Sequence, residues 1–392
     1  MEFEFWWLLA FPLFFGLGWI AARIDIKQLL SEYRSLPRSY FKGLNFLLNE
    51  QPDKAIEAFI EVVSADSETI ELNFALGSLF RRRGEVERAI RMHQNLLDRI
   101  DLDKETKTKV LFELGQDYLK AGLLDRAETI FRDLQPTLFA NSALQFLLEI
   151  YQREKEWGKA IETARALASI SGKSLHKEIA HFHCELALNY QTHAQLSEAK
   201  KSLQEALAYD RDCVRANILL GEFASSENNH EQAIQHWRGV ETQKSEYFPL
   251  VAEKLMVAYR ALGKAEEGLN LLRYYLRKHN SLPLLNVVFQ AELNHNGVEA
   301  AHTLVRDELR RHPTLQGLDK LLEADLMRAP IERRHDIQLI KNLVQDHARR
   351  LALHHCSNCG FKARHFYWQC PACGLWDTFS PGGAEQELLG TP

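Results

Sequence analysis

The sequence is short of glycine and proline, and it has no excess of positive charge. It holds 20 glycines and 11 prolines, 31 of 392 residues, which is about 8% against the ~12% of average usage. This shortage excludes collagen-like and low-complexity chains and favours long helices. The 48 Lys and Arg stand against 53 Asp and Glu, so the formal net charge is -5. A general attraction for nucleic acid is therefore excluded as the basis of the main function.

Cysteine is scarce as well. The chain has six, too few for a disulfide scaffold at this length. Four of the six fall within eighteen residues, from Cys356 to Cys373. With 46% hydrophobic residues, a chain of this length has room for two or three domains that bury their own cores. The clustered cysteines therefore indicate a local site rather than a device that holds the whole fold together.

An uncharged run of 18 residues, Phe5 to Ala22, lies near the N-terminus. As a helix rising 1.5 Å per residue it is about 27 Å long, which just spans the core of a bilayer. Glu2 and Glu4 precede it, whereas a cleavable signal peptide carries Lys or Arg there. The basic excess follows the run, from Arg23 to Lys42. The pattern predicts one transmembrane anchor, with the bulk of the chain in the cytoplasm.

Small residues recur at nearly constant spacing through most of the chain. A glycine, Gly43, Gly77 or Gly115, stands twelve residues before each of the first three of these positions. A small residue lets two paired helices approach closely, and stacked pairs bury the face that one pair leaves open. The spacing, 33 to 39 residues, predicts a superhelical solenoid with a concave inner surface. The positions are Ala55, Ala89, Ala127, Ala160, Ala199, Ala233, Gly268 and Ala301.

Two short motifs connect this period to a known repeat. Leu114-Gly115 with Tyr118 matches the pattern L-G-x2-Y, and Ala127 with Phe131 matches A-x3-F. On these motifs the region from Leu36 to Pro313 resembles the tetratricopeptide repeat family, whose period is about 34 residues. The resemblance implies an all-α superhelix of about eight repeats that binds other proteins.

In tetratricopeptide arrays the first helix of each pair lines the inner groove. The side chains predicted to face it here are polar and of mixed sign, so we expect the row as a whole to bind a partner. Each residue alone is equally compatible with a solvated surface. The carboxylate clamp of chaperone-binding relatives is not predicted, because Phe74 and Phe112 occupy two of its positions. The row consists of Ser78, Arg81, Gln116, Glu149, Gln152, Gln191, Glu222 and Arg260.

Two C-x2-C hooks stand near the C-terminus, ten residues apart: Cys356 with Cys359, and Cys370 with Cys373. Four such thiolates can converge tetrahedrally, and the glycine that follows each hook allows the tight turn in which backbone N–H groups face sulfur. The pattern predicts one iron or zinc ion bound by the four cysteines. The Cys-Pro-Ala-Cys-Gly hook resembles rubredoxin, although the insert between the hooks is much shorter, which argues against electron transfer.

The segment around the hooks carries seven large apolar side chains between Phe361 and Phe379. About thirty residues cannot bury that many alone, so we expect them to pack on the last helices of the array. Three histidines elsewhere, His176, His181 and His183, have no cysteine or carboxylate at ligand spacing. We interpret them as histidines with ordinary hydrogen-bond partners rather than as metal ligands.

The predicted regions follow one another in a distinctive order. This combination, at this length, resembles the lipopolysaccharide assembly protein B family of Gram-negative inner membranes. The regions are a transmembrane anchor (1–22), a basic linker (23–35), a tetratricopeptide-repeat array (36–313), C-terminal helices (314–353), a rubredoxin-like or zinc-ribbon module (354–379) and a disordered tail (380–392).

The resemblance implies a non-enzymatic adaptor in the bacterial inner membrane that regulates lipopolysaccharide biosynthesis. It would promote turnover of the deacetylase of the lipid A pathway by a membrane-bound ATP-dependent protease. It would also coordinate other inner-membrane proteins of lipopolysaccharide assembly. The resemblance assigns Cys356, Cys359, Cys370 and Cys373 as the metal ligands.

Two other classes of function stay open. One is an electron carrier or redox enzyme that uses the four-cysteine metal, although four thiolates leave no open coordination position for catalysis. The other is a zinc ribbon that binds nucleic acid. From Arg306 to Arg350 the ten basic and eight acidic residues are too evenly balanced to follow a phosphate backbone.

Overall fold

The computed structural model describes Trp19 and residues 38–49, 51–65, 70–98, 102–279, 281–351 and 354–381. Apart from Trp19, the predicted anchor and the predicted linker lie outside these residues, as does the predicted tail from residue 382 onward. Among the helices of the described ranges, none is both long enough and apolar enough to cross a membrane.

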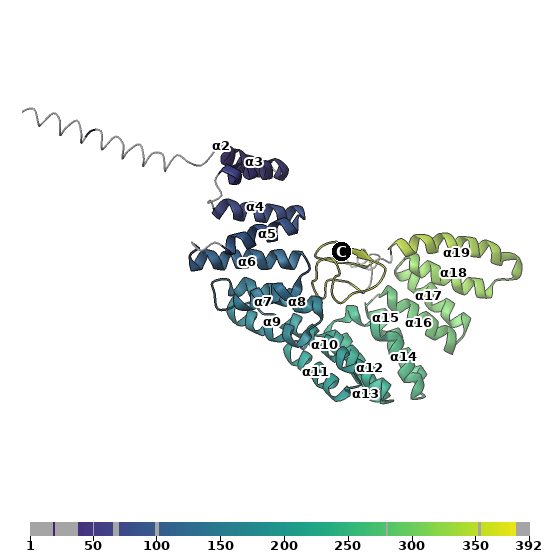
Figure 1. The fold of residues 1–392 in the computed structure, drawn as a ribbon. Coiled ribbons are helices and arrows are strands. Elements are labelled where there is room, and N and C mark those ends of the chain that lie inside the picture. Colours follow the sequence, from purple (N-terminus) through teal and green to yellow (C-terminus); the bar gives the residue numbers. More distant parts are fainter. Residues whose placement is uncertain are drawn as a thin grey trace, which may run out of the picture. The chain divides into compact units, whose positions relative to one another are not determined.

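Residues 1–150 form one compact unit, which consists of helices in its described part. The helices pair in chain order, each first helix against the second helix that follows it (Figure 1). They are α2 (Arg38–Leu48), α3 (Pro52–Ala65), α4 (Ile70–Arg83), α5 (Val86–Leu97), α6 (Lys104–Lys120), α7 (Leu124–Asp133) and most of α8 (Ala140–Glu154).

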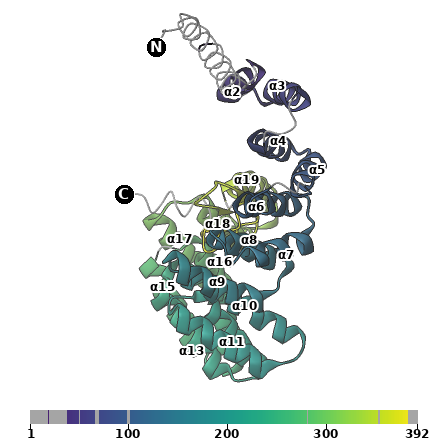
Figure 2. The ribbon, with the colours of Figure 1, turned by 60° about the vertical axis from the view of Figure 1, so that its left-hand side comes forward.

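Residues 151–392 form the second unit, in which helix pairs again follow one another (Figure 2). A small non-helical module ends its described part. The elements are α9 (Trp157–Ser171), α10 (His176–Thr192), α11 (Leu196–Tyr209), α12 (Val214–Ser226), α13 (His230–Gln243), η1 (Ser245–Tyr247), α14 (Pro249–Ala261), α15 (Ala265–His279), α16 (Leu282–His295), α17 (Val298–Arg311), α18 (Leu315–Arg328), α19 (Ile331–Leu351), β1 (His354–His355) and β2 (Lys362–Ala363).

A glycine in the first helix and a ring in the second hold each of the tightest pairs together. A Cβ atom added to Gly115 in α6 would lie 2.9 Å from the Phe131 ring of α7, closer than van der Waals contact permits. Gly43 faces Phe59 and Gly221 faces Trp237 in the same way. In each case the ring stands four residues after the small residue of the repeat. The predicted all-α array of paired helices is confirmed within each unit, with this glycine–ring contact in its tightest pairs.

Candidate metal centre and inner surface

The two cysteine hooks fold into identical turns. The amide of Gly360 donates to the carbonyl of Cys356 at 2.8 Å, and the amide of Gly374 donates to the carbonyl of Cys370 at 2.8 Å. Both glycines have a φ of +73°, a left-handed conformation that costs glycine little and other residues more. The sequence pattern C-x2-C-G therefore produces two matching loops, each of which turns its two sulfurs toward the other loop.

Short backbone pairings hold the two loops in register. Strand β1 pairs with β2 in antiparallel register, His354 opposite Ala363. Cys356 also pairs with Phe379 as an isolated bridge, and Gln369 pairs with Trp376. The first hook is thus paired with the end of the module. The second hook is closed by the pairing of the residues that flank it, Gln369 and Trp376.

The four sulfurs lie where one tetrahedral metal ion would need them. The Sγ atoms of Cys356 and Cys373 are 3.7 Å apart, as are those of Cys359 and Cys370, and all four lie within 4.8 Å of one another. A metal–sulfur bond of about 2.3 Å gives a tetrahedron with edges of about 3.8 Å. The four predicted ligands therefore come together at metal-binding geometry, and four thiolates suit iron or zinc equally well.

The acidities of the thiols differ within this set. Burial acts against ionisation of Cys356, but hydrogen bonds from Thr378 and from two backbone amides of its own loop lower its pKa to about 6. A backbone hydrogen bond at Phe361 favours the thiolate of Cys359, yet burial and the neighbouring thiols raise the pKa of Cys359 to about 12. Four adjacent thiolates repel one another, so complete ionisation requires the positive charge that a bound metal supplies.

The module packs against the middle of the helical array within its own unit. Trp376 stacks on His181 of α10 with ring centroids 4.6 Å apart, and Trp368 stacks on Tyr247 of η1 at 5.5 Å. The guanidinium of Arg215, in α12, lies 5.9 Å from the Trp368 ring and 5.7 Å from the Trp376 ring. The module therefore covers α10, α12 and η1 with its tryptophans.

The expected packing of these tryptophans on the last helices was wrong. The reason is visible in α19, which runs for 21 residues and is therefore about 30 Å long. It packs on α18 as the second helix of the last pair, and the chain that leaves it forms the module, an irregular yellow trace beside α19 (Figure 1). The tryptophans consequently reach the middle of the unit.

Asp377 fixes the module by two polar contacts. Its carboxylate accepts from His181 Nε2 at 3.1 Å and from Lys244 Nζ at 3.3 Å. Burial acts against ionisation, but the hydrogen bond and charge of His181 together with Lys244 lower the pKa of Asp377. His181 is only 2% exposed, and the interpretation of it as a histidine with a structural partner agrees with this contact.

We expect Asp377→Asn to loosen the module without unfolding the array. Asp377 has a φ of +54°, which asparagine also tolerates, so the change removes the charge and keeps the backbone. Hydrogen bonds to charged groups contribute about 1.5–3 kcal/mol, and thermal denaturation at constant metal content should show a loss of that size. Asp336→Ala, at an exposed position on α19, is the control. An unchanged melting temperature for Asp377→Asn would contradict this role.

In the first unit, the predicted partner row is partly engaged inside the protein. Arg81 forms ion pairs with Glu113 at 2.6 Å and with Asp117 at 2.7 Å, and Ser78 donates to Glu113 at 3.5 Å. The second oxygen of Asp117 contacts His93 Nδ1 at 2.5 Å, and the side chains of both residues are fully buried. Arg81 thus belongs to a buried network between α4, α5 and α6. Two further members of the row, Gln116 and Glu149, are half-buried.

In the second unit, one member of the row meets the module and two line hollows. Gln152 accepts a hydrogen bond from Gln369 of the module at 3.1 Å, and Gln191 is exposed. Glu222, which is paired with Lys254, lines a hollow of about 470 Å³. Arg260 lines a second hollow, of about 300 Å³.

These two hollows adjoin each other along α14. Glu253 and Val257 line both of them, and Val257 is 55% exposed although it is apolar. Asn286 and Gln290 of α16 form the far wall of the second hollow. The structure therefore brings Glu222 and Arg260 of the predicted row to one stretch of surface, over α12, α14 and α16.

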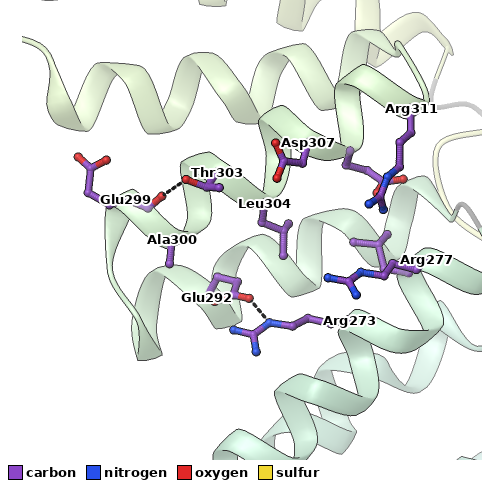
Figure 3. A pocket seen from close by; sticks show the side chains of 11 residues that line it. Arg273, Arg277, Glu292, Glu299, Ala300, Thr303, Leu304, Asp307 and Arg311 are labelled. Carbon is purple, nitrogen blue, oxygen red and sulfur yellow. Dashed lines mark hydrogen bonds and ion pairs between the residues drawn. The ribbon is translucent and has the colours of Figure 1, made fainter.

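A further hollow, of about 480 Å³, lies between α15, α16 and α17 and was missed by the sequence analysis. Figure 3 shows Arg273 directed at the carboxylate of Glu292, and the hydroxyl of Thr303 directed at the backbone carbonyl of Glu299. Three positive and four negative side chains line it, so it presents no net positive field to an anion. The charged members are Arg273, Arg277, Arg311, Glu292, Glu299, Asp307 and Glu308. Spacing alone did not reveal it, because these residues come from three helices.

Comparison with known proteins agrees with the fold and with the site. Residues 354–381 match the model of a rubredoxin metal binding domain, and residues 72–108 and 184–245 match tetratricopeptide repeats. A crystal structure of MamA protein is 20% identical and covers 44% of this chain and 92% of its own, with a TM-score of 0.31, too low to add to the argument.

Two relatives match over nearly their whole length. Lipopolysaccharide assembly protein B of Escherichia coli strain K12 is 35% identical over 376 residues, 95% of this chain and 97% of the relative. Lipopolysaccharide assembly protein B of Haemophilus influenzae is 30% identical over 386 residues, with the same coverage of both chains. With the helical repeats and the four-cysteine module arranged as described, the chain belongs to the lipopolysaccharide assembly protein B family.

Proposed function

We propose that this protein is a non-enzymatic adaptor that regulates lipopolysaccharide assembly. The observation that carries the proposal is the 35% identity with lipopolysaccharide assembly protein B of Escherichia coli over 95% of the chain. The four cysteines support it, because a closed set of four thiolates stabilises a fold and leaves no position for substrate. The hollows over α12, α14 and α16 in the second unit support it as well, since helical repeat proteins bind partners through such surfaces.

The proposed location is the bacterial inner membrane. The uncharged run from Phe5 to Ala22 serves as the single anchor, and the basic residues after it keep residues 23–392 in the cytoplasm. A reducing cytoplasm is also the compartment in which clustered cysteines bind metal rather than form disulfides. Anchor and metal module are thus consistent with one orientation.

The proposed mechanism is an increase in effective concentration. A scaffold confined to the membrane holds the soluble deacetylase of the lipid A pathway beside a membrane-bound ATP-dependent protease, and encounter becomes faster without catalysis by the scaffold. The hollows over α12, α14 and α16, which Glu222 and Arg260 line, are the proposed docking surface for a segment of a partner. Other inner-membrane assembly proteins are further candidates for this surface.

Deleting residues 1–22 should abolish the function and leave the fold intact. The repeats bury their own core, so a chain of residues 23–392 should remain helical and keep its melting temperature, but it disperses through the cytoplasm. We would measure the half-life of the deacetylase after protein synthesis is stopped, in cells that lack their own family member. The full chain should shorten that half-life, and the truncated chain at equal abundance should not.

Four results would decide against parts of this proposal. Equal activity of the truncated chain contradicts the concentration mechanism, and a deacetylase half-life that the full chain leaves unchanged contradicts the adaptor role. Arg260→Glu, compared with Arg310→Glu at an exposed position of α17, tests the docking surface, and equal activity of the two variants contradicts it. A reversible redox change of the metal that tracks the half-life would favour the electron carrier instead.

A further inference from the structure

Two cysteines outside the metal module face each other inside the array. Cys184 lies in α10, and Cys213 is the residue just before α12. Their Sγ atoms are 3.8 Å apart, although 29 residues separate them in the sequence. They are 0% and 2% exposed. The metal module does not use them, so this pair has no role in the function described above.

The surroundings of the pair allow the sulfurs to approach. A disulfide bond is about 2.05 Å long, so the two sulfurs would move together by roughly 1.8 Å. Cys213 precedes the first helical residue of α12, with a φ of -69° and a ψ of 86°, and it can adjust without breaking a helix. Several of the buried neighbours are alanines, which present little bulk: Ala180, Ala187, Ala199, Ala206 and Ala216.

The two thiols differ in acidity. A hydrogen bond from Cys184 lowers the pKa of Cys213 despite burial, and the nearby His181 acts in the same direction. Burial keeps the pKa of Cys184 well above its usual range. A thiolate beside a protonated thiol is the arrangement in which one sulfur attacks an oxidant and the other resolves the product.

Both cysteines lie next to the residues that hold the metal module. His181, which binds Asp377, stands one helical turn before Cys184. Arg215, which faces the two tryptophans of the module, stands two residues after Cys213. Arg215 is also paired with Glu185 at 2.7 Å. The two sulfurs therefore lie beside the surface on which the module rests.

We propose that Cys184 and Cys213 are an oxidisable pair that peroxide converts to a disulfide, linking α10 to the start of α12 beside the docked metal module. In the first step the Cys213 sulfur attacks one oxygen of hydrogen peroxide, the O–O bond breaks, and a sulfenic acid and one water form. In the second step the Cys184 sulfur attacks the Cys213 sulfur, and the sulfenic hydroxyl leaves with the thiol proton as a second water. The two thiols lose two electrons, which peroxide accepts.

The test uses the full-length, metal-loaded chain in detergent, treated with hydrogen peroxide. Remaining thiols are alkylated, the protein is digested without reductant, and mass spectrometry searches for a peptide linked through Cys184 and Cys213. We expect this peptide, two hydrogen masses lighter than its parts, and its disappearance after treatment with dithiothreitol. A chromogenic chelator follows metal release in parallel, and the link should form before the metal is lost.

The matched variant is Cys184→Ala, which adds one alanine to a cluster already rich in alanine. It should lose the link and any oxidation-dependent shift in melting temperature, with its metal content unchanged. Because both thiols are buried, peroxide reaches them through local opening. Asp377→Asn, which loosens the module, should therefore raise the rate of linkage. If peroxide releases the metal while both thiols remain free, or modifies each thiol singly without a link, the proposal is wrong.

Discussion

Cys356→Ser should lose the metal and detach the module from α10 and η1. The change replaces a soft thiolate by a protonated hydroxyl in a closed set of four ligands. Structural zinc contributes on the order of 10 kcal/mol to the folding of small isolated modules, and residues 354–381 have little other core, built around Cys356, Cys370 and Phe379. Without metal, Trp368 and Trp376 should therefore leave Tyr247 and His181.

Metal content by elemental analysis, thermal denaturation and limited proteolysis would check this result. We expect less than one metal ion per chain, a lower melting temperature and rapid cleavage within residues 354–381, while the first repeats stay protected. Ser357→Ala is the control, because Ser357 is exposed and its backbone amide, which donates to the carbonyl of Thr378, is kept in the variant. If the metal is lost while melting and cleavage stay the same, the metal does not hold the module in place.

Asp117→Ala should destabilise the first unit more than any change on its surface. Asp117 binds Arg81 through one oxygen and His93 through the other, and its side chain is fully buried. Removing one partner of a buried ionic network leaves uncompensated polar groups and costs about 3–5 kcal/mol. Urea unfolding followed by circular dichroism should show that loss, and Asp133→Ala, at an exposed position of α7, should show almost none.

Replacing all three polar residues of this network together distinguishes the cost of unpaired polar groups from the cost of lost packing. His93 occupies the position that Phe59 and Phe131 hold in neighbouring repeats, with its ring against Gly77. The triple variant His93→Phe, Arg81→Met and Asp117→Leu restores an apolar contact, and buried ionic groups replaced in this way often give equal or greater stability. If this variant is as unstable as Asp117→Ala, unpaired buried polar groups are not the cause of the loss in Asp117→Ala.

Local pattern predicted most of the array and the metal centre. Ala55, Ala127 and Ala233 are all completely buried, as their period required, because each repeat packs mainly on its neighbours. The four cysteines were found by spacing, since both loops are short and each is closed by a backbone hydrogen bond between its own residues. Features that arise within about forty residues were therefore readable from the sequence.

Two kinds of feature were not readable. Some turns between paired helices use a left-handed residue other than glycine, namely Lys155, Ala194 and Asn228, so the search for glycine did not find them. The docking of the module joins residues far apart, as in the hydrogen bond between Gln152 and Gln369, 217 positions away. No repeated spacing in the sequence predicts such a pair, because the two side chains come together only when the chain has folded.

The docked module also changes how the second unit should come apart. In an open solenoid each repeat touches only its neighbours, and the end repeats can fray one at a time. Here Trp376 of the module stacks on His181 of α10. The helices from α10 to α19 are therefore joined at both ends, through their neighbours in the array and through the module, and form a closed circuit of contacts. None of them is then a free end, and helices between α10 and α19 should open together in a single cooperative step, for as long as the metal keeps the circuit closed.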